Sequence, residues 1–347
     1  MRQPANNVTG DSEQAGLVEP SHTAFKRMRL DSEINARLVA AEMIRQLTLH
    51  TSPRQPANNI TGGNELAGLD DNLDLARRAR ERRDNILEAI TNLDQLPVAA
   101  DKIFDANIPF CKAAVQLSDP AFYDKLPFPF VGAILPDRFN TSGKKNGDMW
   151  FYMGREKFKE LVERVENMQR SNKISTLWVY GTKGYGKSHI LATLVCHLAG
   201  QGKRVIYIPD YRECVKDSAE YFRTAMYFAW ADDENMQKKI MALKSLEEIY
   251  KFLKRHKDVI LVIDQMNGLE ELREESAKLK EKKGELSDYL ERFRASHKAV
   301  LSTSANNRSF LLMQVKQTSD AKMRVYGGLT TVSLNKNSFA KWDFSNY

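Results

Sequence analysis

Short apolar runs recur through the second half of the chain, each bounded by glycine, proline or charged residues. Their β-branched and aromatic residues are typical of strands that are buried on both faces. The predicted strands are "ISTLWVY" (174–180), "KRVIYIPD" (203–210), "VILVID" (259–264), "KAVLSTSANN" (298–307) and a last one within "KMRVYGGLTTVSL" (322–334). Because amphipathic stretches separate these runs, the pattern favours an α/β domain with a parallel sheet.

Helical spacing of apolar residues appears between the strands. The stretch "KSHILATLVCHL" (187–198) repeats apolar residues on one face and is followed by glycines. The stretch "SLEEIYKFLKRH" opens with Ser245 and Glu248 at capping-box spacing, which predicts a helix start. A highly charged helical stretch over 268–293 is expected to be interrupted at Gly284, because glycine is a poor helix former.

The first third of the chain contains a duplication. The segment "RQPANNVTGDSEQAGL" (2–17) returns as "RQPANNITGGNELAGL" (54–69), and both copies are rich in Asn, Gly, Gln and Pro. Such a composition cannot bury a core, so both copies are interpreted as flexible linker. Between them, 32–49 is amphipathic and predicts one short helix.

A longer amphipathic helix is predicted over 72–96. Its apolar residues suit one face, and a cluster of arginines is assigned to the other face. The cluster comprises Arg77, Arg78, Arg80, Arg82 and Arg83. A solvated helix face is the favoured interpretation, and contact with nucleic acid through these arginines is the alternative.

These features predict three parts. Residues 1–70 form a flexible duplicated segment with one short helix, residues 71–149 a helical and Pro/aromatic-rich adaptor region, and residues 150–347 the α/β domain. The N-terminal region as a whole is therefore expected to be helical and partly disordered.

A glycine-rich loop joins the first predicted strand of this domain to its helix. The residues "GTKGYGKS" (181–188) fit G-x-x-x-x-G-K-[ST] in the strand–loop–helix context that a phosphate-binding P-loop requires. Gly181, Gly184 and Gly186 let backbone N–H groups face an anion, and the helix N-terminus adds its positive dipole end. Lys187 is expected to face solvent and reach the β- and γ-phosphates. The remaining predicted contacts are Ser188, through its hydroxyl on Mg²⁺, and His189 on the nucleotide.

A P-loop enzyme also needs a carboxylate on the metal side and a group that handles the attacking water. Asp264 ends an apolar run and is the predicted metal-side acid, together with Ser188. The next residue is Gln265, where many such ATPases have a second carboxylate. An amide orients water but cannot accept its proton as a carboxylate does, so slow or regulated hydrolysis is expected. Asn306 is the first candidate at the polar end of the 298–307 strand, followed by Thr303 and Ser304.

The order of the strands predicts the sheet. A P-loop strand, a plain strand, an acid-ended strand and a polar-ended strand follow one another, as in P-loop NTPases of the additional-strand (AAA+/STAND-like) class. In those sheets the polar-ended strand lies between the P-loop strand and the acid-ended strand. The element "FYMGREKFKELVERV" (151–165) also resembles a segment that signal-transduction ATPases place over the nucleotide base.

Net charge and cysteine content give only a little information about the partners and the cellular compartment of the protein. The net charge of +7 favours anionic partners without choosing one. The three cysteines lack C-x-x-C spacing, which favours a reducing compartment over a disulfide scaffold or zinc cluster. Neither a signal peptide nor a membrane span is seen in the sequence, so an intracellular location, in cytoplasm or nucleus, is expected.

Three segments together resemble a known family. The P-loop stretch, "VILVIDQMNGLE" (259–270) and "VLSTSANN" (300–307) are similar to the ATPase module of Crinkler-type effectors and the related retrotransposon hot-spot proteins. The resemblance implies that the nucleotide is ATP and that glutamine after the metal-side acid, as in Asp264-Gln265, is usual in this family. It also implies an effector role, which is often exercised in a host nucleus. Two features depart from the family: the leader of many Crinklers is not visible, and few residues follow Asn307 for a further effector domain.

Alternatives stay open at this point. The leading interpretation is an ATP-binding, Mg²⁺-dependent ATPase, with a protein partner or oligomer possible. A non-catalytic nucleotide switch or scaffold is the second, because of Gln265. A small-molecule P-loop kinase is the third, in which Asp210 and Arg212 would hold the substrate.

Overall fold

The computed structural model describes residues 64–97, 112–132, 135–139, 148–181, 184, 186–269, 275–304 and 330–333, with side chains except at 64–70, 304 and 330–333. All of them belong to one compact unit, 63–347. Residues 1–63, with the first copy of the duplicated segment, most of the second and the short helix predicted over 32–49, lie outside the described residues. The last residues of the second copy, 64–69, are helical, so the linker prediction is wrong for them. The three-part division itself stays a prediction. No helix in the described ranges is long and apolar enough to cross a membrane.

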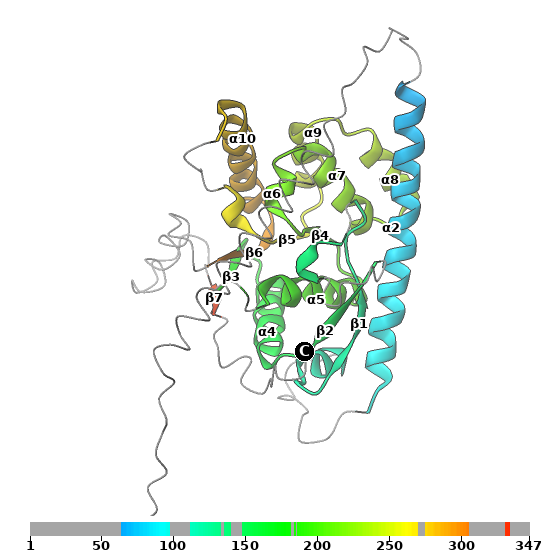
Figure 1. The fold of residues 1–347 in the computed structure, drawn as a ribbon, viewed down its shortest axis with the longest axis vertical. Coiled ribbons are helices and arrows are strands. Elements are labelled where there is room, and N and C mark those ends of the chain that lie inside the picture. The colour runs from blue at the N-terminus through cyan, green and yellow to red at the C-terminus, as the bar shows by residue number, and fades with distance from the viewer. Residues whose placement is uncertain are drawn as a thin grey trace, which may run out of the picture. The chain divides into compact units, whose positions relative to one another are not determined.

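A five-stranded sheet forms the centre of this unit (Figure 1). Its strand order is β4-β5-β6-β3-β7, and all neighbouring strands pair in parallel. The strands are β3 (Thr176–Gly181), β4 (Val205–Ile208), β5 (Ile260–Ile263), β6 (Lys298–Ser304) and β7 (Thr330–Ser333). The predicted position of the polar-ended strand β6, between the P-loop strand β3 and the acid-ended strand β5, is confirmed.

The register of β6 aligns the strand ends that carry the predicted site. Gly181 at the end of β3 lies opposite Ser304, and Ile263 at the end of β5 lies opposite Leu301. Because parallel strands end at the same edge of a sheet, the P-loop and Asp264 start from neighbouring points of that edge.

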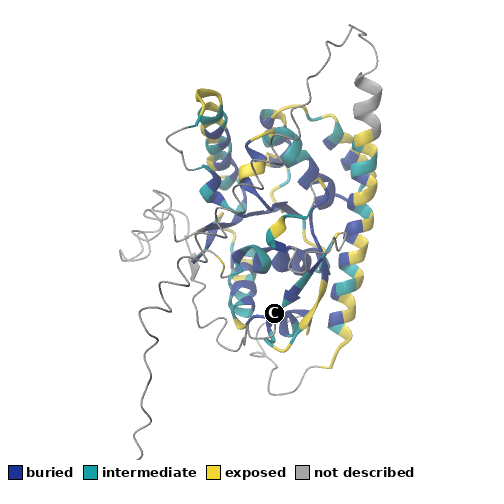
Figure 2. Ribbon diagram, in the orientation of Figure 1, coloured by how far each residue is buried: buried dark blue, intermediate teal, exposed yellow. Residues whose placement is uncertain are grey.

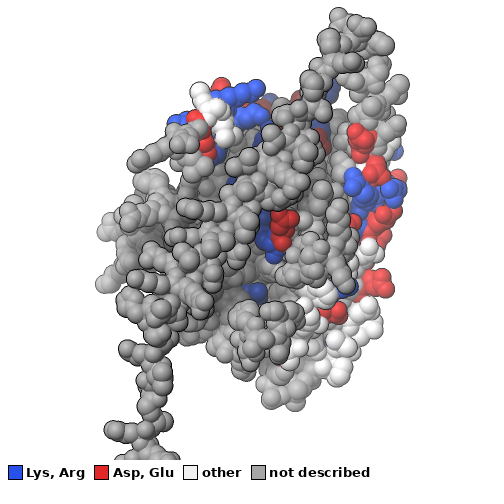
Figure 3. Space-filling view, viewed as in Figure 1, with Lys and Arg blue, Asp and Glu red and all other residues white. Residues whose placement is uncertain are grey.

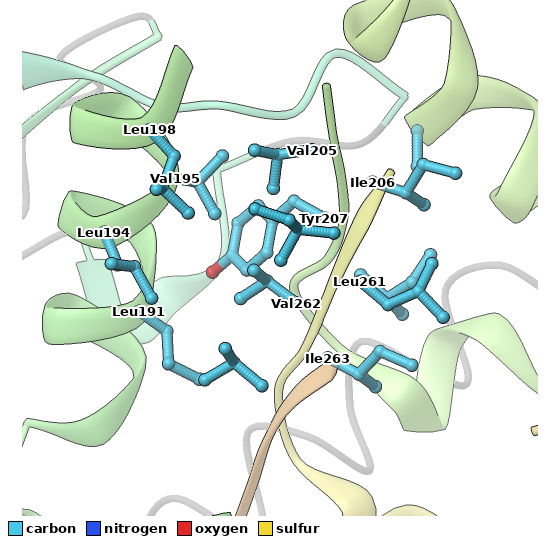
Figure 4. Packing of buried hydrophobic residues seen from close by; sticks show 14 of the residues in the cluster. Leu191, Leu194, Val195, Leu198, Val205, Ile206, Tyr207, Leu261, Val262 and Ile263 are labelled. Atoms are coloured by element: carbon cyan, nitrogen blue, oxygen red, sulfur yellow. The ribbon is translucent and has the colours of Figure 1, made fainter. Parts of the chain in front are cut away.

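Helices cover both faces of the sheet. They are α4 (Glu156–Arg170), α5 (Lys187–Gly200), α6 (Tyr211–Cys214), α7 (Ser218–Ala229), α8 (Glu234–Met241), α9 (Leu246–Lys254) and α10 (Ala277–Arg294), with a 3-10 turn η3 (Met266–Leu269) after β5. Figure 4 shows the period of two in the strands: Tyr207 points toward Leu194 on α5, whereas Ile206 and Leu261 point to the other face.

Local capping signals explain several helix starts. The Ser245 hydroxyl accepts a hydrogen bond from the Glu248 N–H at 3.3 Å. Helix α9 begins at Leu246, directly after Ser245, as the capping-box spacing predicts. The prediction of a break at Gly284 is wrong, because α10 runs through this residue from Ala277 to Arg294. Gly284 is exposed and its neighbours have good helix propensity, so one glycine does not end the helix.

Replacing Gly284 by alanine is expected to stabilise the protein by about 1 kcal/mol, the usual difference in helix propensity. No atom lies within 4 Å of the added Cβ, so no packing penalty opposes this gain. Gly200→Ala is the matched control, since its Cβ would lie 2.5 Å from Ile90 Cγ2 and should destabilise. Urea unfolding of both variants measures the difference, and equal changes at the two positions would contradict the explanation.

The region before the sheet packs on helices of the α/β domain. It contains α2 (Asn64–Gln95), α3 (Lys112–Ser118), β1 (Tyr123–Pro127), a 3-10 turn η2 (Asp137–Phe139) and β2 (Met149–Met153). β1 and β2 pair antiparallel. α2 contacts α5 and α7 along one side, with its buried face toward them (Figure 2).

The arginine cluster of α2 is only partly a solvated face. Arg77 and Arg78 pair with Asp74 on the exposed side, where acidic and basic side chains intermingle (Figure 3). The assignment of all five arginines to solvent is wrong for Arg82 and Arg83, whose residues are 6% and 5% exposed. Their guanidinium groups donate to main-chain carbonyls of distant segments, including Phe128 for Arg82. Hydrogen bonds to carbonyls compensate the burial of these charges.

Candidate nucleotide site

The P-loop begins where β3 ends and finishes where α5 begins. Gly184 and Gly186 have φ of 90° and 73°, which L side chains rarely adopt, and Gly186 is the N-cap of α5. The loop residues Thr182, Lys183 and Tyr185 lie outside the described residues. Strand, glycine-rich turn and helix therefore follow one another as the motif requires, and the N-terminus of α5 begins directly at the loop.

Lys187 is the first residue of α5 and is 9% exposed. Its Nζ donates to the Gly181 carbonyl at 2.8 Å, so the expectation of a solvent-facing ammonium is wrong. The side chain turns back along the loop because that carbonyl is an acceptor within its reach. Burial lowers the pKa of Lys187, and the charge of Asp264 acts in the opposite direction. The ammonium and the carboxylate thus interact across the same site.

Asp264 follows β5 directly and is 1% exposed. Its Oδ1 accepts hydrogen bonds from the Gln265 N–H, at 2.8 Å, and from the Ser302 hydroxyl on β6. Burial raises the pKa of Asp264, while Arg138, Ser188 and Ser302 act to lower it. Ser188 from the P-loop helix and Ser302 from β6 therefore approach one carboxylate.

The second oxygen of Asp264 has a different environment. Within the described residues Oδ2 has no hydrogen-bond partner, although it is buried. The Arg138 Nη2 lies 3.8 Å away, beyond hydrogen-bond distance. A buried carboxylate oxygen without a donor, with a serine hydroxyl nearby, fits a small hard cation that takes oxygen ligands. No cluster of three or more His, Cys, Asp or Glu forms a protein-only metal cage in the described ranges.

Comparison with known proteins agrees with this geometry. A family model for an ATPase domain, predominantly from Archaea, matches residues 155–345. The chain belongs to this ATPase family. The match begins at Arg155 and includes the P-loop and Asp264, so the site described above lies within the ATPase domain. No curated protein sequence matches the chain significantly.

Three solved structures have some similarity to the chain. A DNA replication initiation factor has a TM-score of 0.31 at 16% identity, over 60% of this chain and 53% of that chain. AMPPCP-bound DnaA from Aquifex aeolicus has a TM-score of 0.29 at 18% identity, over 53% of this chain and 48% of that chain. PCH-2 of C. elegans has a TM-score of 0.29 at 12% identity, over 51% of this chain and 42% of that chain. The chain spans about half the length of these structures.

Gln265 adopts the left-handed region, with φ of 62°, and no other described non-glycine residue has a positive φ. Its N–H donates both to Asp264 Oδ1 and to the Ser302 hydroxyl, at 3.2 Å in the second case. Such backbone strain persists where surrounding contacts hold it, and it often occurs at functional sites. In this ATPase domain the strained turn fixes the end of β5 beside β6.

His189 lies in the first turn of α5, and its ring packs against aromatic side chains. The ring centroid is 4.8 Å from that of Phe139 and 5.3 Å from that of Trp150. Burial lowers the pKa of His189 to about 3, and the charges of Arg155 and Arg138 add to this shift, so the imidazole is neutral. We therefore expect any contact of His189 with a nucleotide to use its backbone N–H.

The polar end of β6 is described only in part. Thr303 is fully buried, and its hydroxyl has no hydrogen-bond partner within the described ranges. The side chain of Ser304 and all of Asn306, the first candidate, lie outside the described residues. Ser302, which the sequence analysis did not single out, makes the contact with Asp264 from this strand. Its position inside an apolar run was the available signal.

Two arginines near the loop also had no assigned role. Arg155 is 8% exposed, and a Cβ on Gly186 would lie 2.0 Å from its Nη1, so its guanidinium packs directly on the loop glycine. The Gly-Arg-Glu sequence before α4 was the signal for it. Arg138, in the Pro/aromatic-rich region, had no comparable signal, because its position depends on tertiary packing.

Proposed function

We propose that the chain binds ATP together with Mg²⁺ at the P-loop and hydrolyses the ATP slowly or under regulation. The observation that carries this proposal is the convergence of Lys187, Ser188 and the buried Asp264 at one edge of the sheet. The membership of the chain in an ATPase family supports the same reading.

Each group has a defined role in this proposal. The backbone around Gly184 and Gly186 and the first turn of α5 bind phosphate oxygens through N–H groups. Lys187 exchanges its bond to the Gly181 carbonyl for bonds to the β- and γ-phosphates. Ser188 and Asp264 Oδ2 hold Mg²⁺, which supplies charge stabilisation at the phosphates when bound.

Activation of the attacking water is the step for which the proposed site offers the weakest chemistry. Gln265 lies next to the metal-side acid, and its amide orients a water molecule without accepting its proton. Asn306, at the end of β6, is proposed as a second polar group near the γ-phosphate. An amide at position 265 helps to position the reactants but supplies no general base, so turnover is expected to be slow.

Phosphate release tests the proposal against its main alternative. Purified protein with ATP and Mg²⁺ should release phosphate above a blank, and EDTA should abolish the release. A protein that binds ATP tightly but releases no phosphate under single-turnover conditions would be a nucleotide switch, the role that Gln265 favours. A protein that binds no nucleotide would contradict both functions.

The small-molecule kinase finds less support in the geometry. Asp210 Oδ2 accepts from Arg138 at 3.0 Å and from Arg212 at 2.8 Å, and Oδ1 accepts from the Arg212 N–H at the start of α6. Its carboxylate is therefore engaged within the chain rather than directed at a second substrate.

Replacing Gln265 by glutamate is expected to raise single-turnover hydrolysis about 10-fold or more, since general-base assistance is worth roughly 10²–10⁴-fold. ATP affinity should stay within a few-fold, because Lys187 and Asp264 are unchanged. Gln265→Met has a similar size without a base and serves as the control. If glutamate lowers turnover, repulsion of the γ-phosphate outweighs base assistance, and Gln265 is a positive requirement of the site.

An effector role is a further proposal that rests on sequence resemblance alone. Asp264-Gln265 followed by Asn267, and the polar run after β6, are similar to Crinkler-type ATPase modules. On this proposal the ATPase acts through a protein partner, in the cytoplasm or a host nucleus. Localisation of the tagged full chain in host cells tests it, and exclusion from both compartments would contradict it.

A further inference from the structure

Arg138 lies at the nucleotide site although it precedes the family match at 155–345. It occupies the short turn η2, whose neighbour Phe139 is 1% exposed. The Phe139 ring packs 5.3 Å from Trp150 and 4.8 Å from His189, centroid to centroid. Because His189 belongs to the first turn of α5, this packing ties the turn to the P-loop helix and fixes where Arg138 starts.

The guanidinium group of Arg138 spans the ends of two strands. Its Nη1 donates to Asp210 Oδ2 at 3.0 Å, and its Nη2 donates to the Pro209 carbonyl, both just beyond β4. The same Nη2 lies 3.8 Å from Asp264 Oδ2, just beyond β5. The side chain is 22% exposed, so the group is held firmly but is reachable from solvent.

The neutralisation of Asp210 does not require Arg138. Arg212 already makes two side-chain bonds to this carboxylate, from Nε at 3.1 Å and Nη2 at 2.8 Å. Arg138 adds a second positive charge beside it and extends that charge toward Asp264. The oxygen it approaches is the one that has no hydrogen-bond partner within the described residues.

We propose that Arg138 contacts the terminal phosphate of the bound nucleoside triphosphate, as an arginine supplied by the same chain from outside the family-matched region. The proposal rests on the function proposed above, which puts the γ-phosphate and its metal beside Asp264. An arginine held at this point presents N–H donors to phosphate oxygens in the geometry that guanidinium suits best. Asp210 and the Pro209 carbonyl act as its supports.

The proposal predicts that loss of Arg138 affects the binding of ATP more than that of ADP, because only ATP carries the γ-phosphate. Arg138→Gln is expected to weaken binding of a non-hydrolysable ATP analogue with Mg²⁺ about 10-fold or more, the effect of losing one charged hydrogen bond. Binding of ADP with Mg²⁺ should change less than about 2-fold by the same reasoning. Arg138→Lys keeps the charge and should recover part of the ATP preference.

The experiment is a titration of both nucleotides into the full chain, with thermal melting of every variant. Arg212→Gln is the matched control: it removes the other arginine of Asp210 and should leave the ATP-to-ADP ratio unchanged. An equal loss for both nucleotides, or no loss, would overturn the role of Arg138 while leaving the site intact. A wild type that binds neither nucleotide would overturn the proposed function as well. If Arg138→Gln has a clearly lower melting temperature than the wild type, the ATP-to-ADP affinity ratio of Arg138→Lys decides whether Arg138 contacts the γ-phosphate.

Discussion

Replacing Lys187 by methionine is expected to weaken ATP binding about 100-fold, since the lost ammonium removes more than one charge-assisted hydrogen bond to phosphate. Methionine keeps the apolar stem that lies buried along the P-loop, where Lys187 is only 9% exposed. The fold should therefore survive, and its melting temperature should stay close to that of the wild type. Isothermal titration with ATP and Mg²⁺ measures the affinity.

Lys251→Met provides the control for this substitution. Lys251 lies on α9, which packs on α7 and α10, and it pairs with Glu247 at 3.4 Å on an exposed surface. Its loss should leave ATP affinity unchanged, because surface ion pairs contribute little. An ATP affinity of Lys187→Met equal to that of the wild type would mean that phosphates do not bind at this loop.

Replacing Asp264 by asparagine is expected to separate activity from stability. Hydrolysis should fall about 100-fold or more, because an amide N–H₂ replaces one of the oxygens available to Mg²⁺ and the charge is lost. Stability should rise, because burial raises the pKa of Asp264 and keeping this carboxylate charged opposes folding. Oδ1 of asparagine still accepts from Ser302, so the strand ends should keep their positions.

Two measurements check this prediction together. Steady-state phosphate release gives the loss of activity, and urea unfolding at neutral pH gives the change in the free energy of unfolding. Ser302→Ala serves as a comparison, since it removes a hydrogen bond to the same carboxylate and should lower stability. An Asp264→Asn variant that is less stable and equally active would show that the carboxylate has a structural role only.

The sheet and the P-loop were predictable because their signals are local. A β-branched run, a glycine-rich turn and an amphipathic helix are adjacent in sequence, so Lys187 and Ser188 could be identified without knowledge of the fold. Asp264 could be identified because it ends an apolar strand. The order β5-β6-β3 followed from matching the sequence of strand ends to a known class of sheet.

The features of the site and fold that the sequence did not predict depend on contacts between segments that are distant in the chain. Arg138 reaches the site because Phe139 packs on His189, and a sequence pattern does not record which aromatic residues meet. Arg82 is buried because carbonyls after β1 accept from it, although its spacing on α2 predicts an exposed position. The burial of Lys187 was missed for a similar reason, because the acceptor is the main chain of Gly181.

The most direct test of the central claim is a crystal structure of the full chain with a non-hydrolysable ATP analogue and Mg²⁺. We expect the phosphates over the first turn of α5, with Lys187 Nζ bonded to the β- and γ-phosphates in place of the Gly181 carbonyl. Mg²⁺ should bind the Ser188 hydroxyl and face Asp264 Oδ2. A nucleotide bound elsewhere, or Mg²⁺ that approaches neither Ser188 nor Asp264, would contradict the account.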